Sequence, residues 1–157
     1  MERPLSLTLT HSPTKNLQQE IIPTDKSDLV GLAAGLFSEG YRLVQIGCST
    51  LADAYEITYS FDRHYLLRNL RITLAPGEEL ESISVIYPGA FLYENEIYDL
   101  FGVPIRHIAV DYRGTLYRTA IATPFSIANV RLPEPPKQKS AAAKAESAQS
   151  PGKPAEE

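Results

Sequence analysis

The chain has 157 residues, of which 43% are hydrophobic and 22% charged, and its formal net charge is −4. This length suits one domain with a real core, because single domains most often span about 100–150 residues. The negative charge provides no basic field for gathering nucleic acid or anionic lipid. We expect no membrane span and no secretory leader, because the sequence lacks a continuous apolar run of the length that either requires.

Cysteine and histidine are too few and too scattered to predict a metal centre. Cys48 is the only cysteine, and His11, His64 and His107 lie far apart, whereas an iron–sulfur cluster needs about four thiolates and zinc needs closely spaced ligands. No glycine-rich phosphate loop is present either. We therefore expect no cofactor on this chain and interpret Cys48 as a structural thiol in a reducing cytoplasm.

The first half of the chain predicts an arm, a strand and a helix. Residues 1–16 are expected to form a flexible N-terminal arm, and residues 17–22 predict a short strand that ends at the following proline. Thr24 or Asp25 predicts the N-cap of a helix that ends at Gly40. Its apolar stripe consists of Leu29, Ala33, Leu36 and Phe37, widened by Val30.

Three strands are predicted next. Residues 41–46 suit a strand covered on both faces, and residues 47–51 predict a turn. Residues 54–61 alternate strictly between apolar and polar, and residues 66–74 do the same after a turn at 62–64. The pattern predicts an antiparallel meander packed on helices, which is an α+β fold with the layers of an α/β sandwich. The expected buried face carries Tyr55, Ile57, Tyr59, Phe61, Leu66, Leu70, Ile72 and Leu74.

Two further helices are predicted. Residues 78–86 have apolar residues at helical spacing, and residues 89–103 read GAFLYENEIYDLFGV. The second helix is expected to end at Gly102, the usual position of a left-handed cap, because Pro104 opposes continuation. By their spacing, one face of this predicted helix carries Ala90, Tyr93, Glu94, Ile97 and Phe101.

The end of the chain predicts two segments outside the main domain, which itself spans residues 17–103. Residues 104–132 mix aromatic and basic residues without periodicity, and such a stretch is uncommon in a compact domain unless something holds it. We interpret it as an irregular partner-binding extension, held by another protein. Residues 133–157 are rich in Pro, Ala, Ser, Lys and Glu and predict a disordered low-complexity tail.

The predicted second helix carries a recognisable motif, E-x-E-x-Y-D-L-F-G. It resembles the signature of the 30 kDa subunit of respiratory complex I, which is the C subunit of bacterial NADH–quinone oxidoreductase. The family has arginine where Asn95 stands, and the histidine–proline–arginine run of the family is only echoed after His107. With these departures the chain is most similar to the small subunit of an energy-converting (Ech-type) membrane-bound NiFe hydrogenase. The matching residues are Glu94, Glu96, Tyr98, Asp99, Leu100, Phe101, Gly102 and Val103, after Ala90 and Phe91.

The resemblance implies a cofactor-free structural and assembly subunit of a complex I-like membrane oxidoreductase. It implies binding to the catalytic large subunit, of the NiFe-hydrogenase or the complex I 49 kDa type, in a hetero-oligomer whose other subunits carry iron–sulfur clusters and, in a hydrogenase, a NiFe centre. It also implies a cytoplasmic position on the inner face of the cell membrane, reached through partner subunits. The signature and interface residues that it implies are Glu94, Glu96, Tyr98, Asp99, Phe101, Gly102, His107, Tyr112, Arg113 and Arg118.

These residue types suggest specific roles at a contact. We expect the three carboxylates to hold arginine or backbone N–H groups, within the domain or across the contact. Arg113 and Arg118 would meet acids on the partner. We interpret Tyr98 and Phe101 as core residues.

Other functions fit the sequence as well. The parent complex would alternatively be an NADH–quinone oxidoreductase, with this chain as its C subunit. A free-standing enzyme would use Glu96 and Asp99, which stand at i and i+3 on the predicted helix. A regulatory or scaffold module would recruit partners through residues 133–157.

Overall fold

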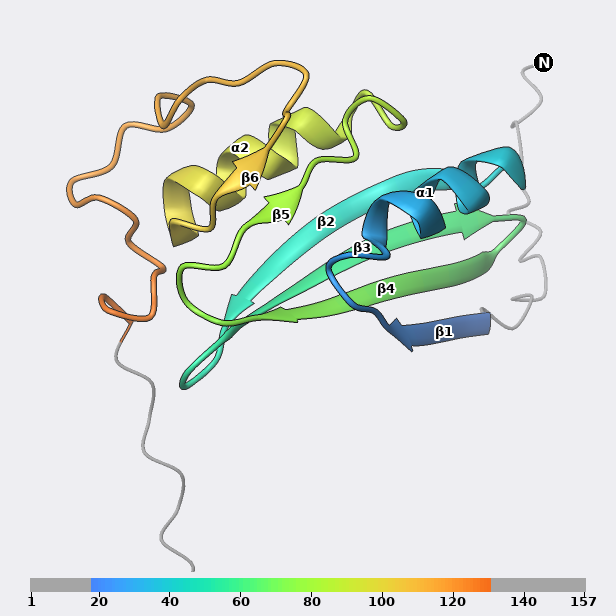
Figure 1. Ribbon diagram of the computed structural model, residues 1–157, viewed down its shortest axis with the longest axis horizontal. Helices are drawn as coiled ribbons and strands as arrows, with labels where there is room; N and C mark the ends of the chain where they lie inside the picture. The colour runs from blue at the N-terminus through green and yellow to red at the C-terminus, as the bar shows by residue number, and fades with distance from the viewer. Residues whose placement is uncertain (1–17, 131–157) are drawn as a thin grey trace, which may run out of the picture.

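The computed structural model of the protein describes residues 18–130, so the predicted arm at residues 1–16 and tail at residues 133–157 lie outside the described part. Figure 1 shows a twisted sheet with two helices packed against it and a long irregular segment running past the second helix. No helix within residues 18–130 is long and apolar enough to cross a membrane. The elements are β1 (Gln18–Pro23), α1 (Leu29–Ser38), β2 (Arg42–Thr50), β3 (Tyr55–Arg63), β4 (Leu66–Leu74), β5 (Leu80–Glu81), α2 (Ala90–Phe101) and β6 (Ile105–Arg106).

The main sheet has the strand order β1-β4-β3-β2. The strands β2, β3 and β4 pair antiparallel, which confirms the predicted meander. The edge strand β1 pairs parallel with β4, from Gln18 opposite Leu66 to Pro23 opposite Arg71. A second, two-stranded sheet joins β5 and β6 in parallel. The architecture is α+β, as the sequence predicts.

One face of the main sheet forms the core with both helices. Ile57, Tyr59 and Phe61 of β3 have no solvent-exposed surface, as their alternation predicts, and the apolar residues of β4 from Leu70 onward are buried beside them. Burying a side chain of this size contributes about 2–3 kcal/mol relative to leaving it in water. The helices add Leu29, Ala33, Leu36, Ala90 and Ile97 to the same cluster.

The predicted turn at residues 47–51 is wrong, because β2 continues through them to Thr50. Gly47, Cys48 and Ser49 are turn-like residues, but pairing with β3 outweighs their local preference. The turn lies one step later, where the Leu51 N–H donates to the Ala54 carbonyl at 2.8 Å. The strand is also an edge strand with several exposed residues, so the prediction that both of its faces are covered is wrong.

The predicted helix at residues 78–86 is also wrong. Leu80, Ile83 and Tyr87 are buried, but the segment is a short strand followed by a turn. Its N–H groups find acceptors elsewhere in the chain: Leu80 donates to the Pro104 carbonyl at 3.0 Å, and Ser82 donates to the Arg106 carbonyl at 2.9 Å. Apolar spacing alone therefore located the buried residues and misassigned the backbone.

Helix α1 begins later than predicted and ends where predicted. Its N-cap is Asp28, without a side-chain hydrogen bond, instead of Thr24 or Asp25. At its end the Gly40 N–H donates to the Phe37 carbonyl and the Tyr41 N–H donates to the Leu36 carbonyl, the bonding pattern of a Schellman motif.

Two glycines of this region provide a first prediction, because the same substitution should have opposite effects at them. Gly40 has φ +82°, so Gly40→Ala should lower the free energy of unfolding by about 1 kcal/mol through backbone strain. Gly35 lies within the helix with open space around its Cα, so Gly35→Ala should raise the free energy of unfolding by about 0.5–1 kcal/mol. Urea denaturation of both variants checks the signs, and a stabilising Gly40→Ala would contradict the motif.

Candidate functional site: the polar cluster of helix α2

Helix α2 buries polar side chains as well as apolar ones. Its buried residues include Glu94, Asn95 and Asp99, and these three are called here the α2 polar cluster. The helix ends as predicted at Gly102, which has φ +77°. Burying polar groups is costly unless they are hydrogen-bonded, so the partners of this cluster show what the helix holds.

Glu94 holds the segment that follows β5. Its carboxylate accepts a hydrogen bond from the Ser82 hydroxyl at 2.6 Å and another from the Ile83 backbone N–H at 2.9 Å. The Ser82 hydroxyl also lies 2.6 Å from that of Ser84. Glu94 has no exposed surface, and no ion pair reaches it within residues 18–130. The carboxyl group therefore depends on hydroxyl and backbone donors alone.

This environment shifts the protonation of Glu94. Burial raises the pKa of Glu94 above its ordinary value of 4.5, and the bonds from Ser82, Ile83 and Ser84 oppose the rise without cancelling it. Burial, and then the charge of Glu94, raises the pKa of Tyr59 well above its ordinary value of 10.0. The tyrosine hydroxyl is buried without a hydrogen-bond partner among the described residues.

Asn95 joins the helix to the segment of residues 107–130, called here the wrap segment. Its amide nitrogen donates to the Phe91 carbonyl at 2.7 Å and to the Val110 carbonyl at 2.8 Å, and its amide oxygen accepts from the Tyr112 N–H at 2.7 Å. The side chain is 1% exposed. An asparagine is suited to this position because it both donates and accepts.

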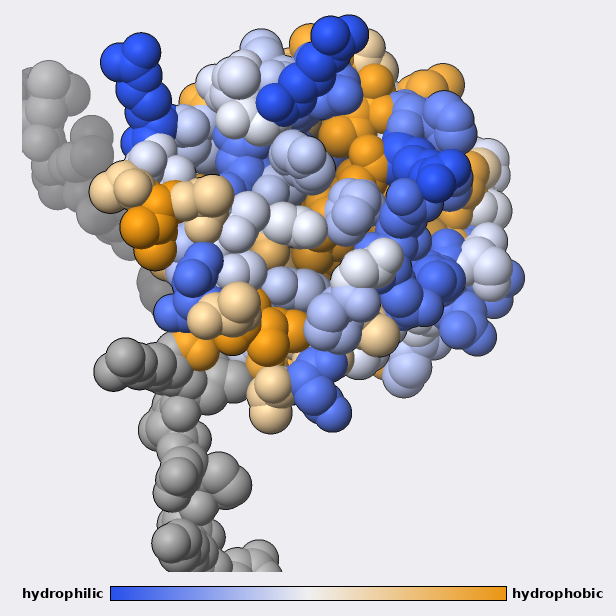
Figure 2. All heavy atoms as spheres, turned by 60° about the vertical axis from the view of Figure 1, so that its left-hand side comes forward, coloured by the Kyte–Doolittle hydropathy of each residue, from blue (hydrophilic) through white to orange (hydrophobic). Residues whose placement is uncertain are grey.

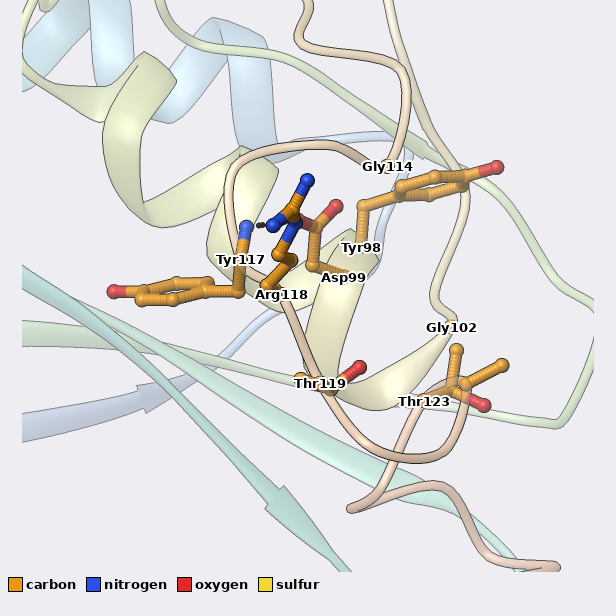
Figure 3. A pocket seen from close by; sticks show the side chains of 9 residues that line it. Tyr98, Asp99, Gly102, Gly114, Tyr117, Arg118, Thr119 and Thr123 are labelled. Atoms are coloured by element: carbon orange, nitrogen blue, oxygen red, sulfur yellow. Dashed lines mark hydrogen bonds between the residues drawn. The ribbon is translucent and has the colours of Figure 1, made fainter.

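Asp99 holds the wrap segment one turn further along the helix. One carboxylate oxygen, Oδ2, accepts from the Tyr117 N–H at 2.8 Å, whereas Oδ1 is buried without a partner in the described part of the chain. Figure 3 shows this carboxylate beside Tyr117, Arg118 and Gly114 in a hollow at the end of α2.

The pair Glu96 and Asp99, which the enzyme hypothesis would use, converges on one tyrosine. Asp99 accepts from the backbone N–H of Tyr117, and Glu96 accepts from the hydroxyl of the same residue at 3.4 Å. Glu96 raises the pKa of the Tyr117 hydroxyl above its ordinary value. Each acid is thus engaged in positioning Tyr117 in this structure.

The wrap segment is bonded to its own chain along α2, and the expectation that it binds a partner stays a prediction. Beyond the α2 polar cluster, the Phe125 N–H donates to the Leu100 carbonyl at 2.8 Å, and the Ile127 N–H donates to the Tyr55 hydroxyl at 3.1 Å. The rings of Phe101 and Phe125 lie 5.5 Å apart. The segment is irregular, as predicted, but it is fixed along α2 (Figure 1).

The remaining residues singled out from the sequence lie on the surface around this cluster. Tyr98 is 41% exposed, so its interpretation as a core residue is wrong, whereas Phe101 is half-buried. His107 is exposed and its Nδ1 lies 2.7 Å from a carboxylate oxygen of Glu81. The other three, Tyr112, Arg113 and Arg118, are exposed on the wrap segment.

Sequence reasoning treated Asn95 only as a departure from the family pattern and did not see its partners, nor the place of Ser82, Ser84 and Tyr117 in the polar network. The Ser84 hydroxyl accepts from the Ala109 N–H at 2.8 Å, so it also holds the wrap segment. The local signal was the pair of serines flanking Ile83, which suits a turn with hydroxyls facing a polar partner.

Neither metal binding nor thiol chemistry gains support from this geometry. Within residues 18–130 no group of three or more His, Cys, Asp or Glu side chains is placed to hold a metal ion. Burial raises the pKa of Cys48 to about 12, which keeps the thiol protonated and weakly nucleophilic near neutral pH.

The fold defines the class of protein first. A chain in the structure of the membrane-bound sulfane sulfur reductase, an archaeal respiratory membrane complex, has the same fold, with a TM-score of 0.65 and 12% identity over 76% of each chain. The protein thus shares an α+β fold with that chain.

Sequence comparison then gives the family. A model of the family "Respiratory-chain NADH dehydrogenase, 30 Kd subunit" matches residues 22–124, and the chain belongs to this family. It is also 38% identical over 66 residues to the C subunit of the NADH-quinone oxidoreductase of Jannaschia sp. (strain CCS1). That match spans 37% of this chain and about a third (32%) of the relative.

Glu94 predicts a pH-dependent stability. Because the pKa of Glu94 is higher in the folded chain than in the unfolded chain, its contribution is fully present below the unfolded pKa and is lost as pH rises through the folded pKa. The difference in free energy of unfolding, wild type minus Glu94→Gln, should therefore fall as pH rises above about 4.5. Denaturant titrations across this range measure it. Glu96→Gln on the same helix is the control, and an equal slope for both variants would contradict the assignment.

Asn95 predicts a local release of the wrap segment. Asn95→Ala removes three hydrogen bonds and leaves buried groups unpaired, so it should cost about 2–4 kcal/mol. Hydrogen exchange of the Tyr112 N–H should accelerate more than exchange in β3. Asn95→Asp is the matched control, because it keeps the acceptor for Tyr112 and loses only the donors; unchanged Tyr112 protection in Asn95→Ala would refute the role.

Proposed function

We propose that this protein is a non-catalytic subunit of a complex I-like membrane-bound oxidoreductase and that it docks onto the catalytic large subunit. The docking surface is the outer side of α2 together with the wrap segment. The observation that carries the proposal is the arrangement of the wrap segment: its inner side is bonded to the α2 polar cluster, so its outer side is presented in a fixed shape.

Exposed apolar side chains on this surface support the proposal. Isolated exposed apolar residues are ordinary, but a group of them among polar residues is typical of a protein–protein contact. In Figure 1, α2 and the wrap segment lie on the left-hand side of the molecule. Figure 2 turns this side forward and shows apolar patches separated by hydrophilic side chains. The exposed large apolar residues of these two segments are Leu92, Tyr98, Val110, Tyr112, Tyr117, Ile121 and Phe125.

The two arginines of the wrap segment add charge to this surface. Arg113 and Arg118 are exposed and make no ion pair within residues 18–130, whereas Arg42, Arg68 and Arg106 each face a carboxylate. Unpaired arginines beside tyrosines are the residue types enriched where interfaces carry most of their binding energy. Acidic side chains of the large subunit would form ion pairs with these two arginines.

An energy-converting NiFe hydrogenase is the first candidate for the parent complex. The departures from the NADH–quinone pattern support it: Asn95 is built into a specific bonding role, and the sequence after His107 differs from the family run. NADH–quinone oxidoreductase is the second candidate, favoured by the similarity to the C subunit of such an enzyme. In either complex this chain would carry no cofactor, the iron–sulfur clusters and any NiFe centre would reside in partners, and the chain would sit on the cytoplasmic side of the cell membrane through those partners.

Co-purification tests the docking. A tagged full-length chain, expressed in its native host, should bring a large subunit and iron–sulfur subunits out of solubilised membranes. Ile121→Asp places a charge on a residue that is 55% exposed and should lower the recovered large subunit at least about tenfold, because a buried unpaired charge is costly in an interface. Quantitative mass spectrometry of the eluate measures the ratio.

Val30→Asp is the matched control for this experiment, because Val30 is exposed on α1 instead of the docking surface. A truncation of residues 133–157 should also leave assembly intact, whereas a scaffold acting through that tail would lose its partners. Recovery of the chain alone, or a catalytic activity of the isolated chain that Asp99→Asn abolishes, would refute the proposal.

A further inference from the structure

We propose that the hollow at the C-terminal end of α2 receives an arginine side chain of the partner subunit, whose guanidinium donates to Asp99. The inference rests on the proposed function, since the hollow lies within the docking surface. It has a volume of about 590 Å³ and is lined mainly by Tyr98, Asp99, Gly114, Tyr117 and Arg118.

Asp99 lines the hollow and has one carboxylate oxygen that the described part of the chain leaves without a hydrogen bond. Asp99 is 8% exposed, and its Oδ2 accepts from the Tyr117 N–H at 2.8 Å. Its Oδ1 is buried and accepts no hydrogen bond within residues 18–130. A buried acceptor without a donor is destabilising, and an ionised one more so. A donor supplied from outside the chain removes this cost, and a cationic donor does so best.

The wall beside this oxygen is built from a glycine and a tyrosine ring. Gly114 has φ +76°, and a Cβ at this position would lie 3.3 Å from Cε1 of Tyr98 and 3.8 Å from Oδ1 of Asp99. Any larger residue would therefore crowd the approach to the carboxylate. Figure 3 shows Gly114 above the carboxylate, between it and the ring of Tyr98.

These surroundings favour guanidinium over ammonium. A guanidinium is planar and weakly hydrated, stacks on aromatic faces and presents several N–H donors at once. Tyr98 provides a partly exposed ring beside Gly114 in this hollow. An ammonium is a compact and strongly hydrated charge, which gains less from such walls.

Arg118, which also lines the hollow, specifies the rest of the partner segment. It forms no ion pair with Asp99 or with any other acid within residues 18–130, although it lines the same hollow. It would repel a lone cation, so the inserted arginine should be accompanied by an acid on the partner that meets Arg118. The expected recognition element is an arginine with a neighbouring Asp or Glu.

Binding of a small probe to the full-length chain tests the pocket independently of the partner. The probe is N-acetyl-arginine amide, followed through the amide signals of Gly114 and Tyr117 in an NMR titration. The matched probes are the lysine analogue and the citrulline analogue, which has nearly the shape of arginine but no charge. Arginine should bind at least about tenfold more tightly than citrulline. Equal shifts with arginine and citrulline would overturn the inference.

Asp99→Asn is the decisive variant because it need not disturb the fold. The asparagine oxygen can still accept from the Tyr117 N–H. The amide nitrogen then stands in place of Oδ1, and because it is itself a donor it cannot accept a hydrogen bond from the guanidinium. Affinity for the arginine probe should fall at least about tenfold, with the exchange protection of the Tyr117 N–H retained. Asp53→Asn, at an exposed acid without a hydrogen bond or ion pair to any described residue, should change neither. Unaltered probe affinity in Asp99→Asn would overturn the inference.

Arg118 gives a further discriminating variant. Arg118→Ala removes a positive charge from the lining of the hollow and should tighten binding of the arginine probe severalfold while leaving the free energy of unfolding unchanged. If the Arg118 guanidinium itself pairs with the Asp99 carboxylate in solution, Arg118→Ala lowers the free energy of unfolding and the wild-type chain does not bind the arginine probe. That result would overturn the inference. The co-purification assay separates this inference from the proposed function. If the Asp99→Asn chain recovers its partners as well as the wild type does, only the arginine-binding role of the hollow is refuted. A wild-type chain that recovers none refutes the docking itself.

Discussion

Backbone groups that lie outside a strand ladder or helix still need partners when they are buried, and in this protein the side chains of α2 provide those partners. Glu94 takes the N–H of Ile83, Asn95 takes the N–H of Tyr112, and Asp99 takes the N–H of Tyr117. Three positions on one helix thereby fix two stretches of chain that have almost no regular structure of their own. The cost is a carboxyl group, Glu94, that is fully buried with no cation beside it in the described part of the chain, which is the reason that burial raises its pKa.

This arrangement separates two roles within one segment. The inner side of the wrap segment is committed to hydrogen bonds and ring contacts with α2, such as those of Asn95 and Phe101. The outer side keeps its tyrosines, apolar residues and arginines exposed. A surface that is fixed before binding loses less conformational entropy when a partner arrives than a segment that orders on contact. Glu94 of the family signature would then act indirectly, because it is buried and helps to set the shape of a contact that other residues make.

Much of the framework follows from periodicity in the sequence. The alternation along β3 and β4 predicts the meander and its buried face, and the helical spacing between Gly89 and Gly102 predicts α2 with its left-handed cap. The failures share a physical cause, because they occur where partners distant in sequence decide the backbone. Residues 47–50 extend a strand because β3 pairs with them, and residues 80–83 are not helical because β6 and Glu94 take their N–H groups. The role of Asn95 was invisible for the same reason, since a one-residue departure from a family pattern reveals nothing about its distant acceptors and donors.

The topology also constrains the order in which the tertiary contacts can form during folding. Strand β1 pairs with β4, with Gln18 opposite Leu66. The wrap segment returns to the meander through two hydrogen bonds: the Ile127 N–H donates to the Tyr55 hydroxyl, and the Thr50 hydroxyl donates to the Phe125 carbonyl. Contacts between residues so far apart in sequence close large loops, which slows folding and leaves partly assembled chains exposed in the meantime. During synthesis Ile127 must leave the ribosome before the last of these contacts can form. Until then the Phe101 ring, which packs on Tyr55, lacks its contact with Phe125, so a nascent chain at this stage leaves aromatic surface exposed.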